Sequence, residues 1–565
     1  MITLDDLILA IGVCGPFQGL LVLAVHSAFV VSVWGIMLMA FGNYNPGWIC
    51  LDDDSIDKNL SLDARGESKI LSTDYSTASS ILAPHNTTDL CTLYTACSNV
   101  SFLPGTSTVA SEWSLVCDRA WILNAIFIVQ MLGLMLGSYL SGQMGDRVGR
   151  KVILYGMMAL HAVTNLLAVF SPSWEAFAAV RFFIGIAVGG ILTTSFVVPL
   201  EFTSEFWRGV VATIPVWSIG TTLFSFAVFL LKDWRHLHIL TATASGVAFL
   251  PVFWVPESFR WLAVQGRDVQ AGTVATKISR LNKRPLPSLE LVATIAESER
   301  GRAEVENSEH YTYLDLFRNN SIRKSSLVIG LIIFSMSVIY FGINFNVQTF
   351  SGDFYTNFLI LSLMELPCVL FSLPTLHFFT RRWGTGIHLL ILSVACFGIT
   401  ITAFSHGDRV YEKNEDGDLR GSIIVGLAIL AKIEIICAWN VIAIFCTELF
   451  PTAVRNMAFG YLNIVIRIGS LIGPVFFSEN PALLYISMAV MGLAILLGAG
   501  LVFLLPETKG RPLVDMLGCS KKFPDDRGLA FVVDQKESMA FKTKSEEIHQ
   551  GLGLEDADES GECLA

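Results

Sequence analysis

Apolar runs of about twenty residues recur along this chain and are separated by shorter polar segments. A helix of that length crosses the ~30 Å hydrocarbon core of a bilayer and satisfies its own backbone hydrogen bonds. We therefore predict an all-α membrane protein with twelve transmembrane helices. The predicted spans are residues 20–41, 121–140, 152–170, 177–200, 210–231, 237–255, 326–345, 354–376, 387–404, 423–445, 458–477 and 483–505.

Longer polar segments divide the chain and predict its domain organisation. The segment between the sixth and seventh spans begins amphipathic, so we expect short helices there, and the acidic tail has too few apolar residues to fold. The predicted parts are a cytosolic N-terminus 1–19, an N-terminal six-helix bundle 20–255 that includes an outer loop 43–118, a cytosolic linker 256–324, a C-terminal six-helix bundle 325–505 and a cytosolic, largely disordered tail 506–565.

Loop charges orient the predicted spans. Basic residues gather on one face, which the positive-inside rule makes cytosolic, although Lys232 and Arg235 are exceptions. Twelve spans return the chain to its starting side, so both termini are predicted to lie in the cytosol. We expect a multi-pass protein of the plasma membrane. The first 18 residues contain Asp5 and Asp6 but no Lys or Arg, which favours a retained first helix over a cleaved signal peptide.

The outer loop combines cysteines with glycosylation acceptors, a pattern typical of an oxidising, extracellular location. Four cysteines allow three pairings, and sequence does not choose among them. A further sequon at Asn319 falls in a predicted cytosolic segment and should stay unmodified. The loop residues are Cys50, Cys91, Cys97 and Cys117 as candidate disulfide cysteines and Asn59, Asn86 and Asn99 as candidate glycosylation sites.

Composition narrows the function classes. Hydrophobic residues make up 53% of the chain and charged residues 15%, against about 25% charged in globular proteins. The sequence shows no basic patch for nucleic acid, no phosphate-binding G-x-x-x-x-G-K-[ST] motif, no metal-ligand spacing and no catalytic constellation. We expect the lipid bilayer and a small solute as partners, and neither a metal, a cofactor nor an enzymatic activity.

A charged segment, Gly142–Lys151, lies between two apolar runs, and we predict a tight turn at the cytosolic membrane face. Gly142 and Gly149 would permit close helix approach and left-handed backbone. Two further patterns repeat between the halves: Glu201-x6-Arg208 returns as Glu448-x6-Arg455, and Pro256-Glu257-Ser258 returns as Pro506-Glu507-Thr508. Arg147-Val-Gly149 is echoed more weakly by Arg382-Trp-Gly384. These repeats predict two related halves.

The charges at these helix ends have two interpretations. They are ordinary topology signals, or they form ion pairs between helices that hold an outward-open state and break as the protein opens inward. The repeat favours the second. The candidate gating residues are Asp146, Arg147, Arg150, Glu201, Arg208, Glu257, Arg260, Glu448, Arg455 and Glu507.

Four charges fall inside predicted spans, where each should face water, substrate or an ion partner. Arg467 and Lys432 are candidate contacts for an anion, and Glu365 for a cationic group; the alternative is that Lys432 or Arg467 simply pairs with Glu434 or Glu365. Aromatic residues near these positions could stack on substrate. The candidate substrate-binding residues are Arg467, Lys432, Glu365, Tyr340, Glu434 and Trp217. For Arg181 we favour a structural role, capped by carbonyls.

The order G-x-x-x-D-R-x-G-R-K in Gly142–Lys151 resembles the loop between helices 2 and 3 of the major facilitator superfamily. Nearly the whole membrane region is similar to solute carrier family 22, the organic cation, zwitterion and anion transporters. The residues that carry the resemblance are Ser111–Trp121, Gly142–Lys151, Arg181–Gly190, Pro199–Glu201, Pro256–Leu262, Tyr340–Gly342, Glu448–Asn456 and Pro506–Gly510. The chain departs from the family pattern at Phe259, where a proline is usual.

The resemblance implies two six-helix pseudo-repeats of the major facilitator fold, with a large extracellular loop after the first helix, that work by alternating access. It also implies a small organic ion as substrate and a co-transported or exchanged ion. Cation carriers of the family tend to place an acidic residue where this chain has Arg467, whereas the Glu365 region is similar to cation and zwitterion carriers. The mixture favours zwitterions or anions. The alternatives are a sugar-porter-like carrier and a non-transporting membrane receptor on the same fold.

Overall fold

The computed structural model describes residues 7–8, 11–12, 15–50, 60–62, 68–70, 91, 94–95, 100–102, 105–204, 207, 210–211, 214–308, 314–318, 320–350, 352–404, 419–450, 452–476 and 481–509. Asn59, Asn86, Asn99, Cys97 and Arg208 lie outside the described residues, as do the side chains of Cys50 and Arg455 and the tail after Lys509.

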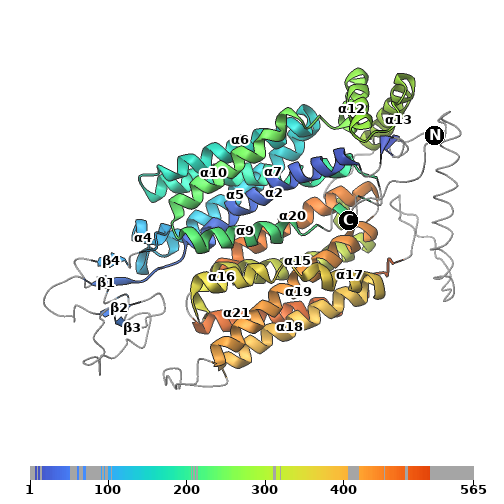
Figure 1. Ribbon diagram of the computed structural model, residues 1–565. Helices are drawn as coiled ribbons and strands as arrows, with labels where there is room; N and C mark the ends of the chain where they lie inside the picture. The colour runs from blue at the N-terminus through green and yellow to red at the C-terminus, as the bar shows by residue number, and fades with distance from the viewer. Residues whose placement is uncertain are drawn as a thin grey trace.

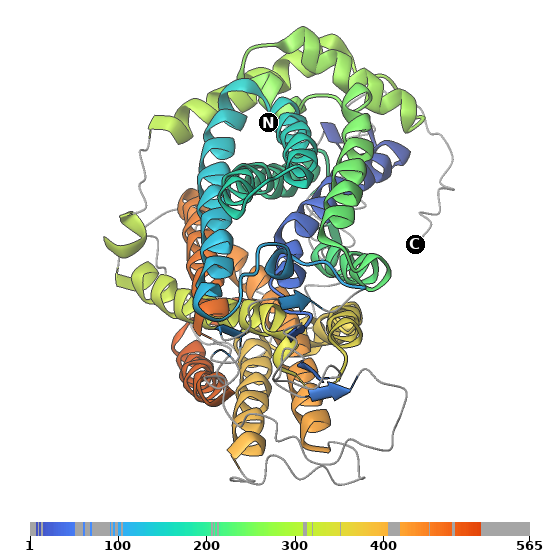
Figure 2. The ribbon, with the colours of Figure 1, turned by 90° about the vertical axis from the view of Figure 1, so that its left-hand side faces the viewer.

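Two bundles of membrane helices confirm the predicted fold class (Figure 1). Figure 2, a view along the bundle, shows the blue-to-green helices above the yellow-to-orange ones. Ten helices in the described residues are long and apolar enough to cross a bilayer, the fifth is shorter, and the eighth comes in two pieces. The N-terminal half contains α2 (Pro16–Gly42), α5 (Trp121–Val148), α6 (Arg150–Val169), α7 (Trp174–Glu201), α9 (Val216–Leu231) and α10 (Trp234–Phe249); the C-terminal half contains α15 (Asn320–Phe345), α16 (Phe354–Leu363) with α17 (Cys368–Phe378), α18 (Arg381–Phe404), α19 (Leu419–Leu449), α20 (Thr452–Phe476) and α21 (Pro481–Leu501).

The eighth span is not the single helix over residues 354–376 that hydropathy predicts. Its helix stops at Leu363 and restarts at Cys368, and the segment between them is a turn that contains Glu365 and Pro367. Proline lacks an amide proton and disfavours helical backbone at the residue before it, which explains the interruption. The break therefore sets a carboxylate where the chain is not helical.

The predicted turn Gly142–Lys151 is also shorter than expected. Helix α5 continues through Val148, and only Gly149, with φ of 120°, separates it from α6. The backbone angle favours glycine here, and a Cβ on Gly149 would also displace the carboxylate of Glu257. Gly142 has open space around it and needs no such explanation.

Helices α5 and α7 pack closely because small residues face each other. A Cβ on Gly133 or Gly137 of α5 would collide with backbone carbonyls of α7, and a Cβ on Gly185 or Gly189 of α7 would collide with those of α5. Both pairs are spaced four residues apart, which is the small-x-x-x-small pattern of membrane helix contacts.

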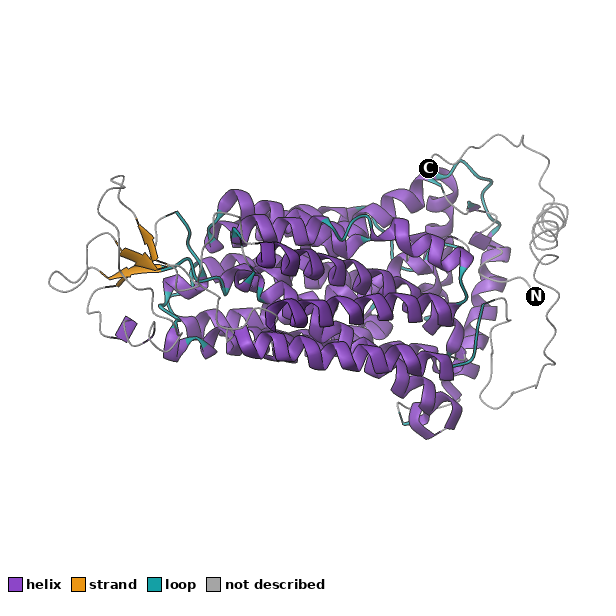
Figure 3. Cartoon of the chain, turned by 90° about the horizontal axis from the view of Figure 1, so that it is seen from below, coloured by secondary structure: helices purple, strands orange, loops and turns teal. Residues whose placement is uncertain are grey.

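One end of the bundle, which we call the sheet end, carries a small antiparallel sheet (Figure 3). Its strands are ordered β3-β2-β1-β4, with β1 (Trp48–Cys50), β2 (Leu60–Leu62), β3 (Ser68–Ile70) and β4 (Val100–Phe102), and Ile49 pairs with Ser101. The short α4 (Val109–Glu112) and η1 (Cys117–Arg119) follow. A disulfide joins Cys91 to Cys117, two of the four candidate cysteines.

The opposite end, which we call the linker end, carries the helices that connect the halves (Figure 1). Asn282 docks them on the start of α2, because its side chain accepts from Phe17 N at 3.1 Å and donates to Ile11 O at 3.1 Å. The helices are α11 (Phe259–Val264), α12 (Asp268–Leu281), α13 (Leu289–Ser308) and α14 (Asp315–Arg318); the remaining short turns are η2 (Leu250–Phe253), η3 (Val347–Thr349) and η4 (Val502–Leu504).

Candidate functional site

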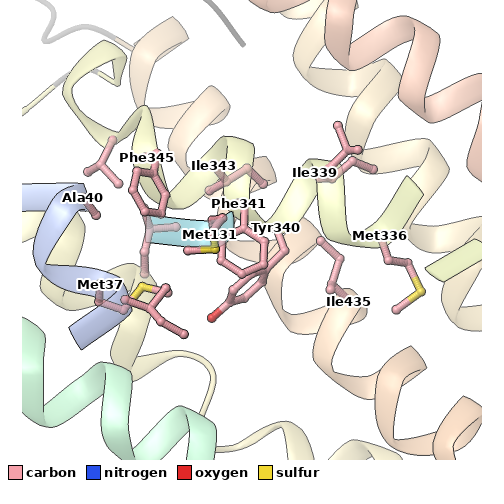
Figure 4. Packing of buried hydrophobic residues seen from close by; sticks show 14 of the residues in the cluster. Met37, Ala40, Met131, Met336, Ile339, Tyr340, Phe341, Ile343, Phe345 and Ile435 are labelled. Atoms are coloured by element: carbon pink, nitrogen blue, oxygen red, sulfur yellow. The ribbon is translucent and has the colours of Figure 1, made fainter. Parts of the chain in front are cut away.

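Aromatic side chains join the two halves near the sheet end. Tyr44, after α2, stacks on Phe354 at the start of α16 with ring centroids 4.2 Å apart. Phe127 of α5 meets Phe345 at the end of α15 at 4.3 Å. Figure 4 shows Met37 and Phe345 in the same apolar wall. The halves are thus packed together at this end.

Polar contacts reinforce this closure. The backbone amide of Asn45 donates to Gln348 Oε1 at 3.3 Å, and the hydroxyls of Thr106 and Tyr355 lie 2.7 Å apart. Lys232 lies over the Tyr355 ring, 4.7 Å from its centroid. This cation–π contact links the two halves and gives a role to Lys232, which is an exception to the positive-inside rule.

Midway along the bundle, Lys432 of α19 and Glu365 in the break after α16 form a fully buried ion pair, with Nζ 2.8 Å from Oε1. Lys432 also donates to Asn344 Oδ1 at 2.9 Å. Of the two interpretations of these charges, mutual neutralisation is the one that this arrangement realises. A solute that uses either charge must first separate the pair.

The N-terminal half contributes to the same site. Thr221 of α9 donates to Glu365 Oε2 at 3.1 Å, and Tyr340 of α15 donates to Oε1 at 3.0 Å. Trp217 of α9 in turn donates to the Tyr340 hydroxyl at 2.6 Å. Glu365 therefore connects the halves. We call this set the interface cluster; it comprises Trp217, Thr221, Tyr340, Asn344, Glu365 and Lys432. Figure 4 shows Tyr340 beside Phe341 and Met131, which form its apolar wall.

Glu434 does not belong to the interface cluster, although sequence grouped it with Lys432. Two residues along a helix turn the side chain by roughly 200°, since each residue turns it by about 100°. Glu434 accordingly leaves the interface and contacts His388 of α18, with Oε2 2.6 Å from Nδ1. In this arrangement Glu434 lies away from the interface cluster, and its role as a substrate contact stays a prediction.

Arg467 of α20 is half-buried and has no ion-pair or hydrogen-bond partner for its side chain among the described residues. Ser470, one turn away on the same helix face, contacts Met131 Sδ of α5 at 3.7 Å. Arg467 therefore lies on the face of α20 that meets the other half. Of the four charges near the middle of their spans, Arg467 is the one that the described surroundings leave without a counter-charge.

At the linker end, carboxylates of the N-terminal half surround the start of α6. Arg150 pairs with Asp146 at 2.5 Å and with Glu201 of α7 at 3.4 Å. Glu257 Oε1 accepts the backbone amides of Arg150 at 2.9 Å and Lys151 at 3.1 Å. Glu257 thus satisfies free N–H groups at the N-terminus of α6 and complements its dipole.

The C-terminal half repeats this arrangement. Arg381 pairs with Glu448 of α19 at 2.9 Å, and Glu507 accepts the amides of Arg381 at 2.9 Å and Arg382 at 3.2 Å. Partial burial would raise the pKa of the Glu507 carboxyl, but these N–H donors and that of Lys509 lower its pKa below the usual 4.5.

The structural equivalent of Arg150 is Arg381, so the sequence-based match of Arg147-Val-Gly149 with Arg382-Trp-Gly384 is out of register. The missed residue, Arg381, could have been found by aligning the halves on Glu448 and Glu507. Asn344 was missed as well; its signal is its position one helical turn from Tyr340.

The ion pairs of Arg150, Arg381 and Arg382 each lie within one half, so none of them bridges the halves as a lock on an outward-open state requires. Arg147 and Arg260 are exposed. Their gating role stays a prediction.

Arg181 of α7 is fully buried and donates to Gly35 O at 3.0 Å and Gln130 Oε1 at 2.5 Å. These contacts of the Arg181 guanidinium with carbonyl oxygens are the ones expected for a structural role.

Two similar halves, closed against each other at one end and with charges buried at their interface, define a membrane transporter of the major facilitator class. The "Sugar (and other) transporter" family profile matches residues 87–517, and this chain belongs to that family. Within it, the chain belongs to solute carrier family 22: it is 30% identical to human solute carrier family 22 member 13 over 76% of this chain and 74% of the relative.

Other relatives and solved structures agree. Human organic cation/carnitine transporter 2 is 27% identical over 73% of this chain and 71% of its own length, and the beta-alanine transporter of Drosophila melanogaster is 28% identical over 73% and 66%. The inward-open xylose transporter XylE from E. coli superposes with a TM-score of 0.55 at 14% identity, over 87% of this chain and 97% of XylE. At that identity, the likeness supports the fold alone.

Proposed function

We propose that this protein carries small organic ions, with zwitterions or anions preferred, across the plasma membrane by alternating access, and that it is not an enzyme. The observation that carries the proposal is the buried Lys432–Glu365 pair between the halves, with Arg467 uncompensated on the same interface. Relatives described as organic cation, carnitine and beta-alanine transporters support the substrate class.

The chemistry of the interface cluster fits a zwitterion. A substrate ammonium can replace Lys432 beside Glu365, while its carboxylate is attracted by Lys432 or Arg467. Each exchange substitutes one ion pair for another, so no charge is left alone in a low-dielectric site. Tyr340 and Trp217 supply aromatic surface next to the pair.

The orientation follows from the same proposal. The sheet end with its disulfide faces outside, the linker end and both termini face the cytosol, and the arrangement described here is closed to the outside. The linker-end charges set the balance between outward-open and inward-open states, since Arg150 and Arg381 each hold two neighbouring helices together. A co-transported or exchanged ion is part of the same proposal.

The alternatives fit less well. A sugar is uncharged and gives no reason to keep four charges inside the membrane spans. A receptor without transport has no need for the paired charge arrangements at the linker end of both halves. We therefore rank both below an organic ion carrier.

Uptake into cells tests the proposal. Labelled carnitine-like zwitterions, tetraethylammonium-like cations and small aromatic carboxylates are compared for the wild type, Arg467→Asp and the charge-keeping control Arg467→Lys. We expect uptake of zwitterions or anions that Arg467→Asp abolishes and Arg467→Lys largely keeps. Uptake of cations alone, unchanged in Arg467→Asp, would refute the role of Arg467. Absence of all uptake, with protein at the surface, would favour the receptor alternative.

A further inference from the structure

A histidine and a glutamate meet inside the C-terminal half, away from the interface cluster. His388 of α18 is 6% exposed and Glu434 of α19 is 8% exposed, and Nδ1 lies 2.6 Å from Oε2. The other ring nitrogen, Nε2, lies 3.2 Å from Thr375 Oγ1 of α17. One imidazole therefore connects three helices.

The hydrogen bonds around the ring can be completed with two different numbers of protons. Thr375 Oγ1 lies 2.9 Å from the carbonyl of Phe371, which can only accept. When the hydroxyl proton points there, the Thr375 oxygen accepts from His388 Nε2–H. One more proton then lies between Nδ1 and Glu434, so the pair carries one proton more than a neutral imidazole beside a carboxylate, whichever of the two holds it.

The hydrogen bonds of the ring can also be completed after this proton has left. When it passes to water, the Thr375 hydroxyl rotates to donate to His388 Nε2, and Nδ1–H remains on the Glu434 carboxylate. What changes is the net charge of the pair. With the extra proton the pair is neutral overall, whereas without it the pair has a net charge of −1, which is unfavourable in a nearly buried site.

The described surroundings offer no cation to balance that charge. On α19, Lys432 is paired with Glu365, and on α18 Arg381 is paired with Glu448. The remaining titratable neighbours are the buried thiols of Cys368 on α17 and Cys437 on α19, with Cys437 Sγ 3.4 Å from Cys368 O. Helix α21, which packs on α18, has no Asp, Glu, Lys, Arg or His.

We propose that His388 and Glu434 form a proton-binding site whose emptying moves α17 away from α18 and α19 so that water reaches Glu434. Helix α17 is short, and the break at Glu365 and Pro367 separates it from α16. It contacts α18 through Thr375, which lies against Gly384, and through Leu376 O, which accepts from Arg381 Nη1 at 3.0 Å. It contacts α19 through Cys368 O, which lies 3.4 Å from Cys437 Sγ. The proton thus stabilises the packed position of α17.

Cysteine alkylation in the purified protein in lipid nanodiscs, without substrate, tests the site. Separation of α17 exposes Cys368 and Cys437, whereas Cys396 and Cys446, which are buried elsewhere, report the pH dependence of the reagent. We expect the labelling of Cys437 relative to Cys396 to rise with pH, by up to about tenfold per unit. Glu434→Gln, which cannot become a buried charge, should remove the rise. The control His161→Gln, a buried histidine bonded to Ser245, should keep it.

Two results would overturn the proposal. The first is labelling of Cys437 in the wild type that does not rise with pH, a measurement that does not depend on the folding of any variant. The second is an equal rise in Glu434→Gln. Uptake measured against pH adds a second readout. Because α17 follows the break with Glu365, the pH profile of wild-type uptake should flatten in Glu434→Gln and not in His161→Gln; this step rests on the proposed function. A wild-type and a Glu434→Gln profile that coincide would contradict it. Absence of uptake would count against the proposed function. The alkylation experiment would still test the proton-binding site, because it does not depend on transport.

Discussion

Lys432 Nζ lies 2.8 Å from Glu365 Oε1, and both side chains are fully buried. Removing one charge leaves the other without a counter-ion in a low-dielectric site, so Lys432→Gln and Glu365→Gln should each cost about 3–5 kcal/mol in unfolding free energy. The double variant Lys432→Met/Glu365→Gln should recover most of this stability, yet none of the three should transport. Thermal unfolding and uptake measure both effects.

A double variant as unstable as either single variant would show that the pair is not the source of the loss. Single variants as stable as the wild type would show that water already reaches both charges.

The Tyr340 hydroxyl donates to Glu365 within the C-terminal half and accepts from Trp217 of the other half, so Tyr340→Phe removes two hydrogen bonds, one of them between the halves. We expect a loss of about 1–3 kcal/mol, because the half-buried Trp217 Nε1–H loses its partner. The Michaelis constant for uptake should change as well. Tyr139→Phe, at an exposed position, serves as the control and should behave as the wild type. An unchanged melting temperature and uptake in Tyr340→Phe would argue against its place in the site.

The contact between α5 and α7 predicts that Gly137→Ala is harmful, because its Cβ would collide with the backbone of Ile186. Overpacking of this kind costs about 1–3 kcal/mol. The same substitution at Gly156, which has open space around it, should be neutral or slightly stabilising, since alanine favours a helix. Melting temperatures of the two variants make the comparison. Equal effects would mean that the helices can separate without loss.

Glu507 predicts a sensitivity to acid at the linker end. Its carboxyl has a folded-state pKa below the usual 4.5, so the stability that it contributes is present at neutral pH and is lost as pH falls through the lowered pKa. Glu507→Gln should be less stable than the wild type at neutral pH and show a smaller further loss in acid. Thermal unfolding from pH 7 downward checks this. Parallel curves for the two proteins would exclude Glu507 as a contributor.

The register of the two halves shows where sequence reasoning ends. The motifs at Glu257 and Glu507 were predicted to be equivalent, and both carboxylates do accept amides at a helix start. The match of Arg147-Val-Gly149 with Arg382-Trp-Gly384 was out of register, because so short a motif can be matched at several positions along a charged segment. Only the shared contact with Glu201 or Glu448 makes Arg150 and Arg381 equivalent.

By itself, the sequence predicted a helical membrane fold in two related halves and the family, because hydropathy and short motifs depend on residues that are close together in the chain. It did not predict the break in the eighth span. The tertiary structure decided the partner of each intramembrane charge. Lys432 and Glu434 are two positions apart, yet one faces Glu365 at the interface and the other His388 within the C-terminal half. That choice depends on the rotation of α19 about its axis and on the break before α17, which are set by packing between distant segments.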